Sequence, residues 1–139
     1  MAFGDLFLDD IHSYRIENMH KANMQCLFPL WHRPTAELAR EFTMQGFQAV
    51  LCCVDEQALS PVFAGREYDD ALLRDLRPGT DPSGENGEFH TFVYAGPIVR
   101  KPIVFSRGER VRREKRFQYC DLIPVEKGYE HLATASHSR

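Results

Sequence analysis

One apolar run limits the fold more than any other feature. Residues 47–54 read Phe-Gln-Ala-Val-Leu-Cys-Cys-Val, with a single polar residue among them. A run of this kind indicates a strand buried on both faces, as in a parallel sheet. Thr35 can cap a preceding helix that ends before Gly46. Because residues 25–28 form a short apolar stretch before that helix, 25–54 is predicted to be a β-α-β unit of an α/β protein.

Asp55 and Glu56 follow this strand directly. In open α/β sheets that edge binds ligands. Capping of the next turn is the stronger interpretation for both side chains.

Capping signals predict two more helices, and the second half of the chain is rich in β-type residues. Asp9 or Asp10 can cap a helix that runs to about Ala22, and Asp69 or Asp70 can cap another one. Three later runs have strand character: residues 91–95, 98–107 and 116–122.

The last two runs are predicted to pair as a hairpin with its turn region at residues 107–116. That region holds six basic residues mixed with Glu109 and Glu114. A solvated tip that prevents edge aggregation is the stronger interpretation, and a phosphate site is the alternative.

Composition excludes several classes of protein. A chain of 139 residues with net charge −3 predicts one domain-sized core and no nucleic-acid partner. Its apolar runs are too short to span a membrane. The four cysteines have neither disulfide nor zinc spacing, so we expect free thiols in a cytoplasmic protein.

A glycine-bearing acidic loop, residues 81–91, is the candidate functional site. It contains Asp81, Glu85, Glu88 and His90, and it leads into a β-type run that would hold it rigidly. Carboxylates packed on one tight loop repel one another, which costs stability. A functional role is one interpretation of why the loop holds several of them. A solvated acidic turn is an equally good alternative.

The chain resembles the diphthine–ammonia ligase family of PP-loop ATPases, of the adenine nucleotide α-hydrolase type, and is closer to its bacterial-type members. The resemblance spans roughly residues 1–125. It is carried by Phe3-Gly4-Asp5-Leu6, Phe28-Pro29-Leu30-Trp31, Gly46-Phe47-Gln48-Ala49, Gly65-Arg66, Gly84-Glu85-Asn86-Gly87-Glu88-Phe89-His90-Thr91-Phe92-Val93 and Gly96-Pro97.

The resemblance implies ATP-dependent amide formation with ATP and Mg²⁺. A carboxylate is adenylated, and ammonia then displaces AMP to give the amide. In eukaryotic and archaeal members the substrate is diphthine, a modified histidine of translation elongation factor two. Bacteria are not expected to carry diphthine, so the resemblance implies another small-molecule or modified-residue carboxylate here.

Two departures from the family pattern limit this implication. Ser83 stands where many such loops have cysteine. The phosphate-binding Ser-Gly-Gly-x-Asp-Ser loop does not occur in the sequence, and the one Ser-Gly pair is followed by Glu85 and Asn86. Negative charge there opposes pyrophosphate binding.

The chain therefore resembles only the later part of the family. Residues 1–60 are expected to be the end of a partial, Rossmann-like parallel sheet of the nucleotide-binding domain. Residues 61–125 are expected to form a small, mainly β substrate-side region, and 126–139 a polar tail.

On this resemblance Glu85, Glu88 and His90 are the expected catalytic residues. The expected substrate-binding residues are Gly84, Asn86, Gly87, Phe89, Thr91 and Tyr94. The carboxylates could bind Mg²⁺, orient an amine or accept its proton. With Phe89 and Tyr94 they would also suit a quaternary ammonium group. His90 is more often structural at such a position, and a metal site of Glu85, Glu88 and His90 is a weaker alternative.

Two hypotheses on function follow. In the first, the chain is a truncated ligase-like protein, inactive alone and dependent on a partner with a PP-loop. In the second, it is a non-catalytic module that binds a small molecule or a protein. Either one predicts a bare sheet edge and a homo-oligomer.

Overall fold

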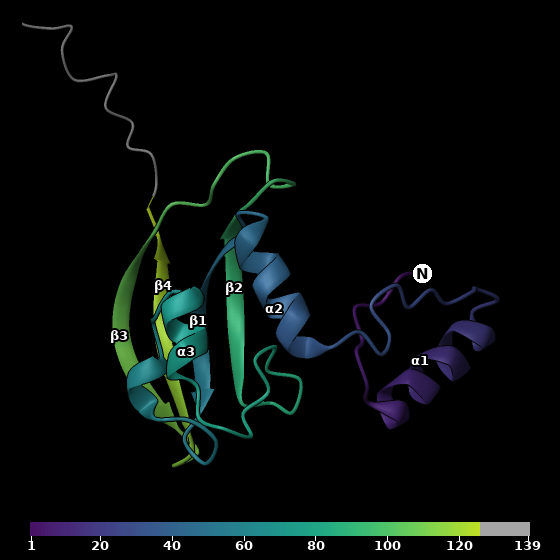
Figure 1. Ribbon diagram of the computed structural model, residues 1–139, viewed down its shortest axis with the longest axis horizontal. Coiled ribbons are helices and arrows are strands. Elements are labelled where there is room, and N and C mark those ends of the chain that lie inside the picture. Colours follow the sequence, from purple (N-terminus) through teal and green to yellow (C-terminus); the bar gives the residue numbers. More distant parts are fainter. Residues whose placement is uncertain (126–139) are drawn as a thin grey trace, which may run out of the picture.

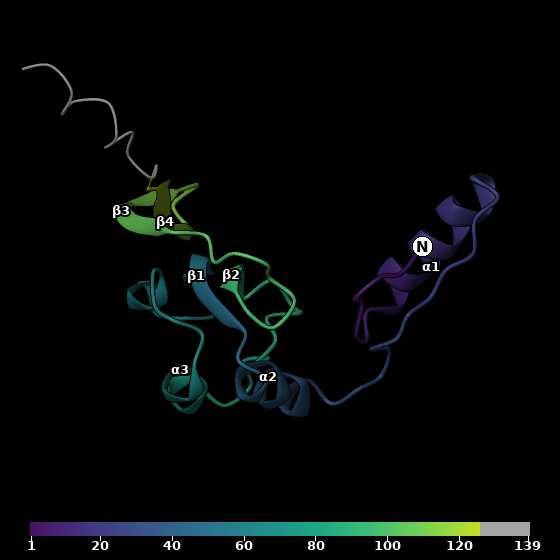
Figure 2. The ribbon, with the colours of Figure 1, turned by 90° about the horizontal axis from the view of Figure 1, so that it is seen from above.

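The computed structural model describes residues 1–125, and the predicted polar tail at 126–139 lies outside the described residues. It shows a mixed α/β fold in which α2 and α3 lie on one side of a sheet while α1 stands apart (Figures 1 and 2). In chain order the elements are α1 (Asp9–Lys21), α2 (Thr35–Met44), β1 (Gln48–Asp55), the 3-10 turn η1 (Pro61–Phe63), α3 (Asp70–Asp75), β2 (Phe89–Ala95), β3 (Phe105–Arg113) and β4 (Phe117–Pro124).

The sheet is antiparallel throughout the described residues. Its strand order is β2-β1-β4-β3, and β1 is antiparallel to both of its neighbours. The predicted parallel β-α-β unit is therefore wrong. Residues 25–28 form no strand, and only a single parallel bridge joins Leu27 to Ala2.

β1 is apolar because it is buried and is paired with other segments along both of its edges. One edge pairs with β2, and the other is shared between β4 and residues 65–68. The amide of Leu51 donates to the carbonyl of Arg66 at 2.9 Å, and the amide of Tyr68 donates to the carbonyl of Ala49 at 2.8 Å. An antiparallel centre strand can thus be as apolar as a parallel one, which is why composition alone misled the prediction.

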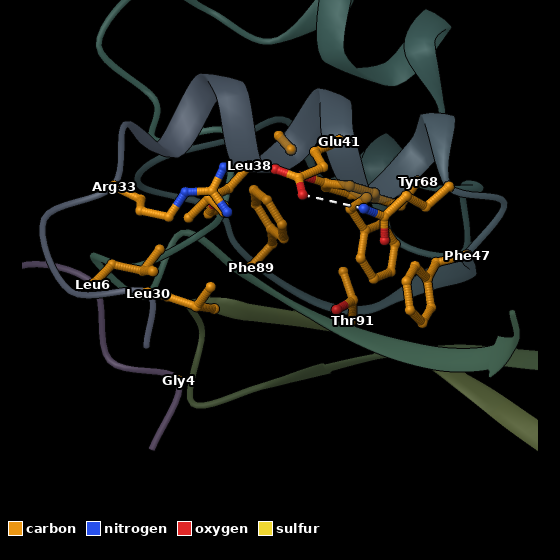
Figure 3. A pocket seen from close by; sticks show the side chains of 14 residues that line it. Gly4, Leu6, Leu30, Arg33, Leu38, Glu41, Phe47, Tyr68, Phe89 and Thr91 are labelled. Carbon is orange, nitrogen blue, oxygen red and sulfur yellow. Dashed lines mark hydrogen bonds and ion pairs between the residues drawn. The ribbon is translucent and has the colours of Figure 1, made fainter. Parts of the chain in front are cut away.

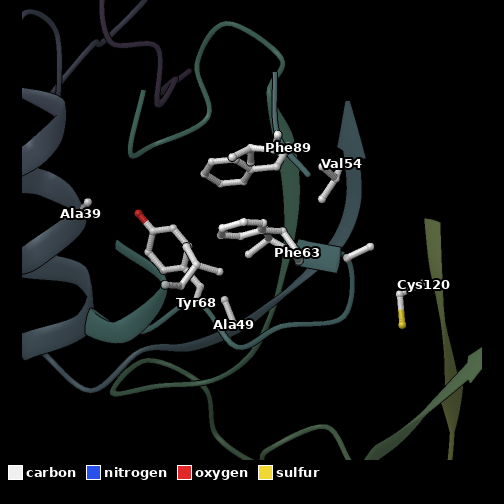
Figure 4. Close-up of a cluster of buried hydrophobic side chains, with 11 residues drawn as sticks. Ala39, Ala49, Val54, Phe63, Tyr68, Phe89 and Cys120 are labelled. Atoms are coloured by element: carbon white, nitrogen blue, oxygen red, sulfur yellow. The ribbon is translucent and has the colours of Figure 1, made fainter. Parts of the chain in front are cut away.

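The main core lies between this sheet and the two short helices. Leu51, Leu59 and Leu72 are fully buried there and pack with the rings of Phe63 and Phe89 (Figure 4). The helix caps support the core. Asp69 accepts a hydrogen bond from the amide of Leu72 at 2.8 Å, which confirms the predicted start of α3.

The hairpin prediction is confirmed for its second strand, but its first strand begins at Phe105 rather than at residue 98, and its turn is shorter than expected. β3 and β4 pair antiparallel, and Glu114 and Lys115 form the turn with φ of 54° and 53°. Residues 107–113 belong to β3, so the predicted tip at 107–116 is wrong in extent. Four of its arginines are held by nearby acceptors: Arg107 by Glu67, Arg110 by the carbonyl of Ala64, Arg112 by Glu56 and Arg116 by Asp55.

Residues 1–33 are built differently. Helix α1 has no buried residue, and it projects away from the sheet in two perpendicular views (Figures 1 and 2). The ring of His12 lies 4.2 Å from that of Trp31 and 4.1 Å from that of Phe28, centroid to centroid. No helix among residues 1–125 has the length and apolar character needed to cross a membrane.

Candidate functional site

The acidic loop between α3 and β2 is organised by the carboxylate of Glu88, which is buried. Its Oε1 accepts hydrogen bonds from the amide of Asp81 at 3.0 Å and from Asn86 Nδ2 at 3.3 Å. Its Oε2 accepts one from the amide of Asn86 at 3.0 Å. Three charge-assisted bonds to two parts of the loop make Glu88 the group that fixes its shape.

Asp81 and the glycines complete the turn. The Asp81 carboxylate accepts from the amide of Glu85 at 2.9 Å and from that of Ser83 at 3.4 Å. Gly84 has φ of 69°, and a Cβ there would lie 2.9 Å from the carbonyl oxygen of Phe89. A side chain at this position would be both strained and crowded, so the backbone requires glycine.

Glu85 is the loop carboxylate that faces residues 1–33. Burial raises its pKa, and repulsion from Asp81 and Asp5 acts in the same direction. A hydrogen bond from the backbone of Leu6 lowers the pKa and opposes part of this effect. A carboxyl group that is costly to ionise, at the junction of two regions, is a candidate for proton transfer.

The other predicted residues diverge because side chains alternate along β2. Phe89 lies in the core, whereas His90 is exposed and its backbone carbonyl accepts from Cys52 Sγ. Tyr94 is on the face opposite to Phe89, where it donates to Glu67 at 2.9 Å. The structure therefore does not assemble the predicted pocket for a quaternary ammonium group.

The alternative of a metal site also finds no support. Among residues 1–125 no three His, Cys, Asp or Glu side chains converge closely enough to hold a metal ion. Glu88 is occupied within the loop and His90 points outward. All four cysteines are free thiols, and Cys53 and Cys120 are buried.

An open cleft of about 480 Å³ lies beside the loop, between α2 and β2 (Figure 3). Gly4 and Leu6 reach it from the N-terminal region. Of the predicted substrate-binding residues, only Phe89 and Thr91 line it. Its walls come from six separate segments, so no local sequence pattern predicts it.

Two hydrogen bonds fasten the loop to this cleft. Ser83 Oγ donates to the carbonyl of Thr35 at 3.1 Å, at the start of α2. The hydroxyl of Tyr68 donates to the carbonyl of Pro82 at 2.6 Å, and burial raises the pKa of Tyr68 to about 12. Ser83 thus has a positioning role that the comparison with cysteine-bearing loops did not predict.

Residues 34–127 match the model of the diphthamide synthase C-terminal domain. The chain belongs to this family. It is 33% identical over 110 residues to the diphthine–ammonia ligases of Rattus norvegicus and Homo sapiens, and 31% identical to that of Danio rerio. These matches cover 75% of the chain but only 41% to 43% of each relative. The chain therefore spans about two fifths of the length of the curated relatives it matches.

The family match confirms the resemblance to the later part of the diphthine–ammonia ligases. The matched range begins just before α2 and includes the acidic loop, most of the cleft and the whole sheet. It also runs across residue 60, where the sequence was predicted to divide. Residues 1–33 lie outside it.

Proposed function

We propose that this chain supplies the substrate side of an ATP-dependent, amide-forming ligase of the diphthine–ammonia type. The observation that carries the proposal is the acidic loop inside the matched family domain, which lines a cleft through Ser83 and holds the partly buried carboxyl group of Glu85 two residues further on. Binding and orienting a carboxylate and an amine are the tasks that such a site suits.

The described residues do not fit the triphosphate of ATP. The sequence has no Ser-Gly-Gly-x-Asp-Ser loop, and its Ser83-Gly84 pair leads into carboxylates rather than into a nest of free backbone amides. We therefore assign adenylation to a partner that carries the PP-loop, and no step of it to the residues of this chain.

The residues of this chain then divide the remaining work. Glu88 and Asp81 hold the loop. As the nitrogen of ammonia forms its bond to the activated carbonyl carbon, the C–O bond to AMP breaks, AMP leaves with the electron pair, and Glu85 accepts the proton that the nitrogen loses. Because its pKa is raised, Glu85 is a stronger base than an ordinary carboxylate. The side chain of His90 is exposed, and no step is assigned to it.

The test is a reconstitution with the full chain. It is mixed with the PP-loop domain of a diphthine–ammonia ligase, ATP, Mg²⁺, ammonium and, in separate reactions, each member of a panel of carboxylic acids that includes elongation factor two with diphthine, and AMP release is measured. We expect release only when both proteins are present, with a loss of roughly 100-fold in kcat for Glu85→Gln.

Glu109→Gln, an exposed carboxylate on β3, is the matched control and should keep full activity. Absence of AMP release with any PP-loop partner and any carboxylate would contradict the proposal.

The second candidate is a non-catalytic binding module. It is favoured by the hydrogen bonds that occupy both oxygens of Glu88 with loop structure. Under this alternative, ligand binding persists in Glu85→Gln and no mixture shows turnover. Any turnover that requires this chain would exclude it.

A further inference from the structure

We propose that the cleft between α2 and β2 binds a carboxylic acid whose apolar body is about the size of one aromatic ring, with Arg33 holding the carboxylate. The inference deepens the proposed function and rests on it only where it makes this acid the substrate for amide formation. Binding itself requires no nucleotide and no partner.

The walls of the cleft set the apolar part of the ligand. Leu38 of α2 faces Phe89 of β2, with Leu6 at one end and Phe47 at the other (Figure 3). Phe42 of α2 also lines the cleft. The rings of Phe42 and Phe47 stack with centroids 4.8 Å apart. A cleft of about 480 Å³ lies within the usual range for small-molecule sites and has ample room for one ring with a short chain.

The rim of the cleft sets the charge of the ligand. Arg33 Nη2 donates to Glu41 Oε2 at 2.6 Å, and Gln45 Nε2 donates to Glu41 Oε1 at 3.1 Å. Both oxygens of Glu41 are thus engaged. A guanidinium group has five N–H donors, and Arg33 uses one of them in the part of the chain that the structure describes. The other N–H groups of Arg33 are available as donors, and its side chain is about 40% exposed, so it can donate hydrogen bonds to the carboxylate of a ligand.

The same geometry argues against a cationic ligand. Glu41 is the one carboxylate that lines the cleft among residues 1–125, and it is already paired with Arg33. Glu85 and Glu88 do not line it. A protonated amine would find no unpaired carboxylate there to accept its N–H groups, whereas an anion would meet Arg33 above an apolar floor.

Three probes of one shape separate these cases: 3-phenylpropionate, 3-phenylpropanamide and 3-phenylpropylamine. Each is titrated into the full chain without nucleotide, and binding is followed by calorimetry and by amide shifts of α2 and β2 in NMR spectra. We expect the acid to bind at least tenfold more tightly than the amide or the amine. Equal affinities, or no binding of the acid, would overturn the proposal.

Charge variants test Arg33 directly. Arg33→Gln should weaken binding of the acid about tenfold and leave binding of the neutral amide unchanged. Arg74→Gln on α3 is the matched control. Glu41→Gln should strengthen binding of the acid several-fold, because it removes the carboxylate that competes for Arg33. A Glu41→Gln variant that loses the acid, or an Arg33→Gln variant that keeps the preference for it, would contradict the assignment.

A steric variant tests the location. Thr91→Trp fills the cleft from β2 and should abolish binding of acid and amide alike, while Met44→Trp, on an exposed position of α2, should not. Unchanged binding in a folded Thr91→Trp variant would place the ligand elsewhere and overturn the proposal. Since these assays contain no ATP, their failure is distinguishable from failure of the ligase reconstitution.

Discussion

Residues 1–33 and residues 34–125 are stabilised in different ways. Of the buried apolar side chains in the described chain, only Leu6 lies before residue 34. The first region depends on stacked rings around Trp31 and on one parallel bridge, whereas the second has a continuous core under a four-stranded sheet. The second region coincides with the matched family domain.

The difference shows where the candidate site belongs. The single buried side chain of the first region, Leu6, lines the cleft, and its backbone reaches Glu85. The well-packed region thus provides the loop and most of the cleft, and the loosely packed region closes one end of it. Catalytic and binding groups are often placed where a rigid element meets a more mobile one.

The largest expected effect comes from the core. Leu51→Ala removes a fully buried side chain and should lower the free energy of unfolding by about 2–5 kcal/mol. Ile16→Ala in α1, whose side chain is 45% exposed, should change it by less than about 0.5 kcal/mol. Urea denaturation measures both. A comparable cost for Ile16→Ala would show that α1 belongs to the same cooperative core.

A smaller effect is expected at the loop. Glu88→Gln keeps the shape of the side chain but replaces one acceptor oxygen by a donor, so it should cost about 1–3 kcal/mol. Amide exchange at Asp81 and Asn86 should increase in the same variant. Glu109→Gln is the control. Normal protection of both amides in Glu88→Gln would mean that another group holds the loop.

The smallest effect, and a pH-dependent one, is expected at the end of β1. Hydrogen bonds from Arg116 lower the pKa of Asp55, burial opposes this, and the amide of Gln57 adds to the lowering. A carboxyl group with a lowered pKa in the folded state stabilises the fold at pH values above its unfolded-state pKa of about 3.9. This stabilisation is lost as the pH falls through the folded-state pKa. Asp55→Asn should therefore lower the urea midpoint at pH 7, and by less than Glu88→Gln lowers it.

The difference between wild type and Asp55→Asn should shrink as the pH falls below about 4. Asp121→Asn, an exposed aspartate on β4, serves as the control. A difference that stays constant down to pH 2 would mean that the carboxylate charge does not contribute.

Local signals in the sequence predicted the elements well. The cap at Asp69 and the apolar strand near 47–54 appear where capping and hydrophobic patterns place them. The helix near Thr35 is also present, but Thr35 is its first residue rather than its cap, because Pro34 occupies the cap position and no side chain caps the helix. Topology was not predictable in this way. The strands that pair with β1, β2 and β4, lie 35 or more residues downstream, and its apolar run fits a parallel and a covered antiparallel strand equally well.

The candidate site was predictable only in part. The glycines and carboxylates of residues 81–91 indicated a constrained loop, and the structure has one. The separate roles of Glu85 and Glu88 depend on burial and on hydrogen bonds to other parts of the chain, which the sequence does not reveal. Arg33 was missed because its importance arises from the cleft, whose walls no single segment encodes.

The most direct test of the central claim is calorimetry of the full chain with ATP and Mg²⁺. If the chain supplies only the substrate side, no binding heat should appear, and a PP-loop partner should be required before any nucleotide is used. Binding of ATP with micromolar affinity by this chain alone would contradict that account, because a nucleotide site would then exist among its own residues.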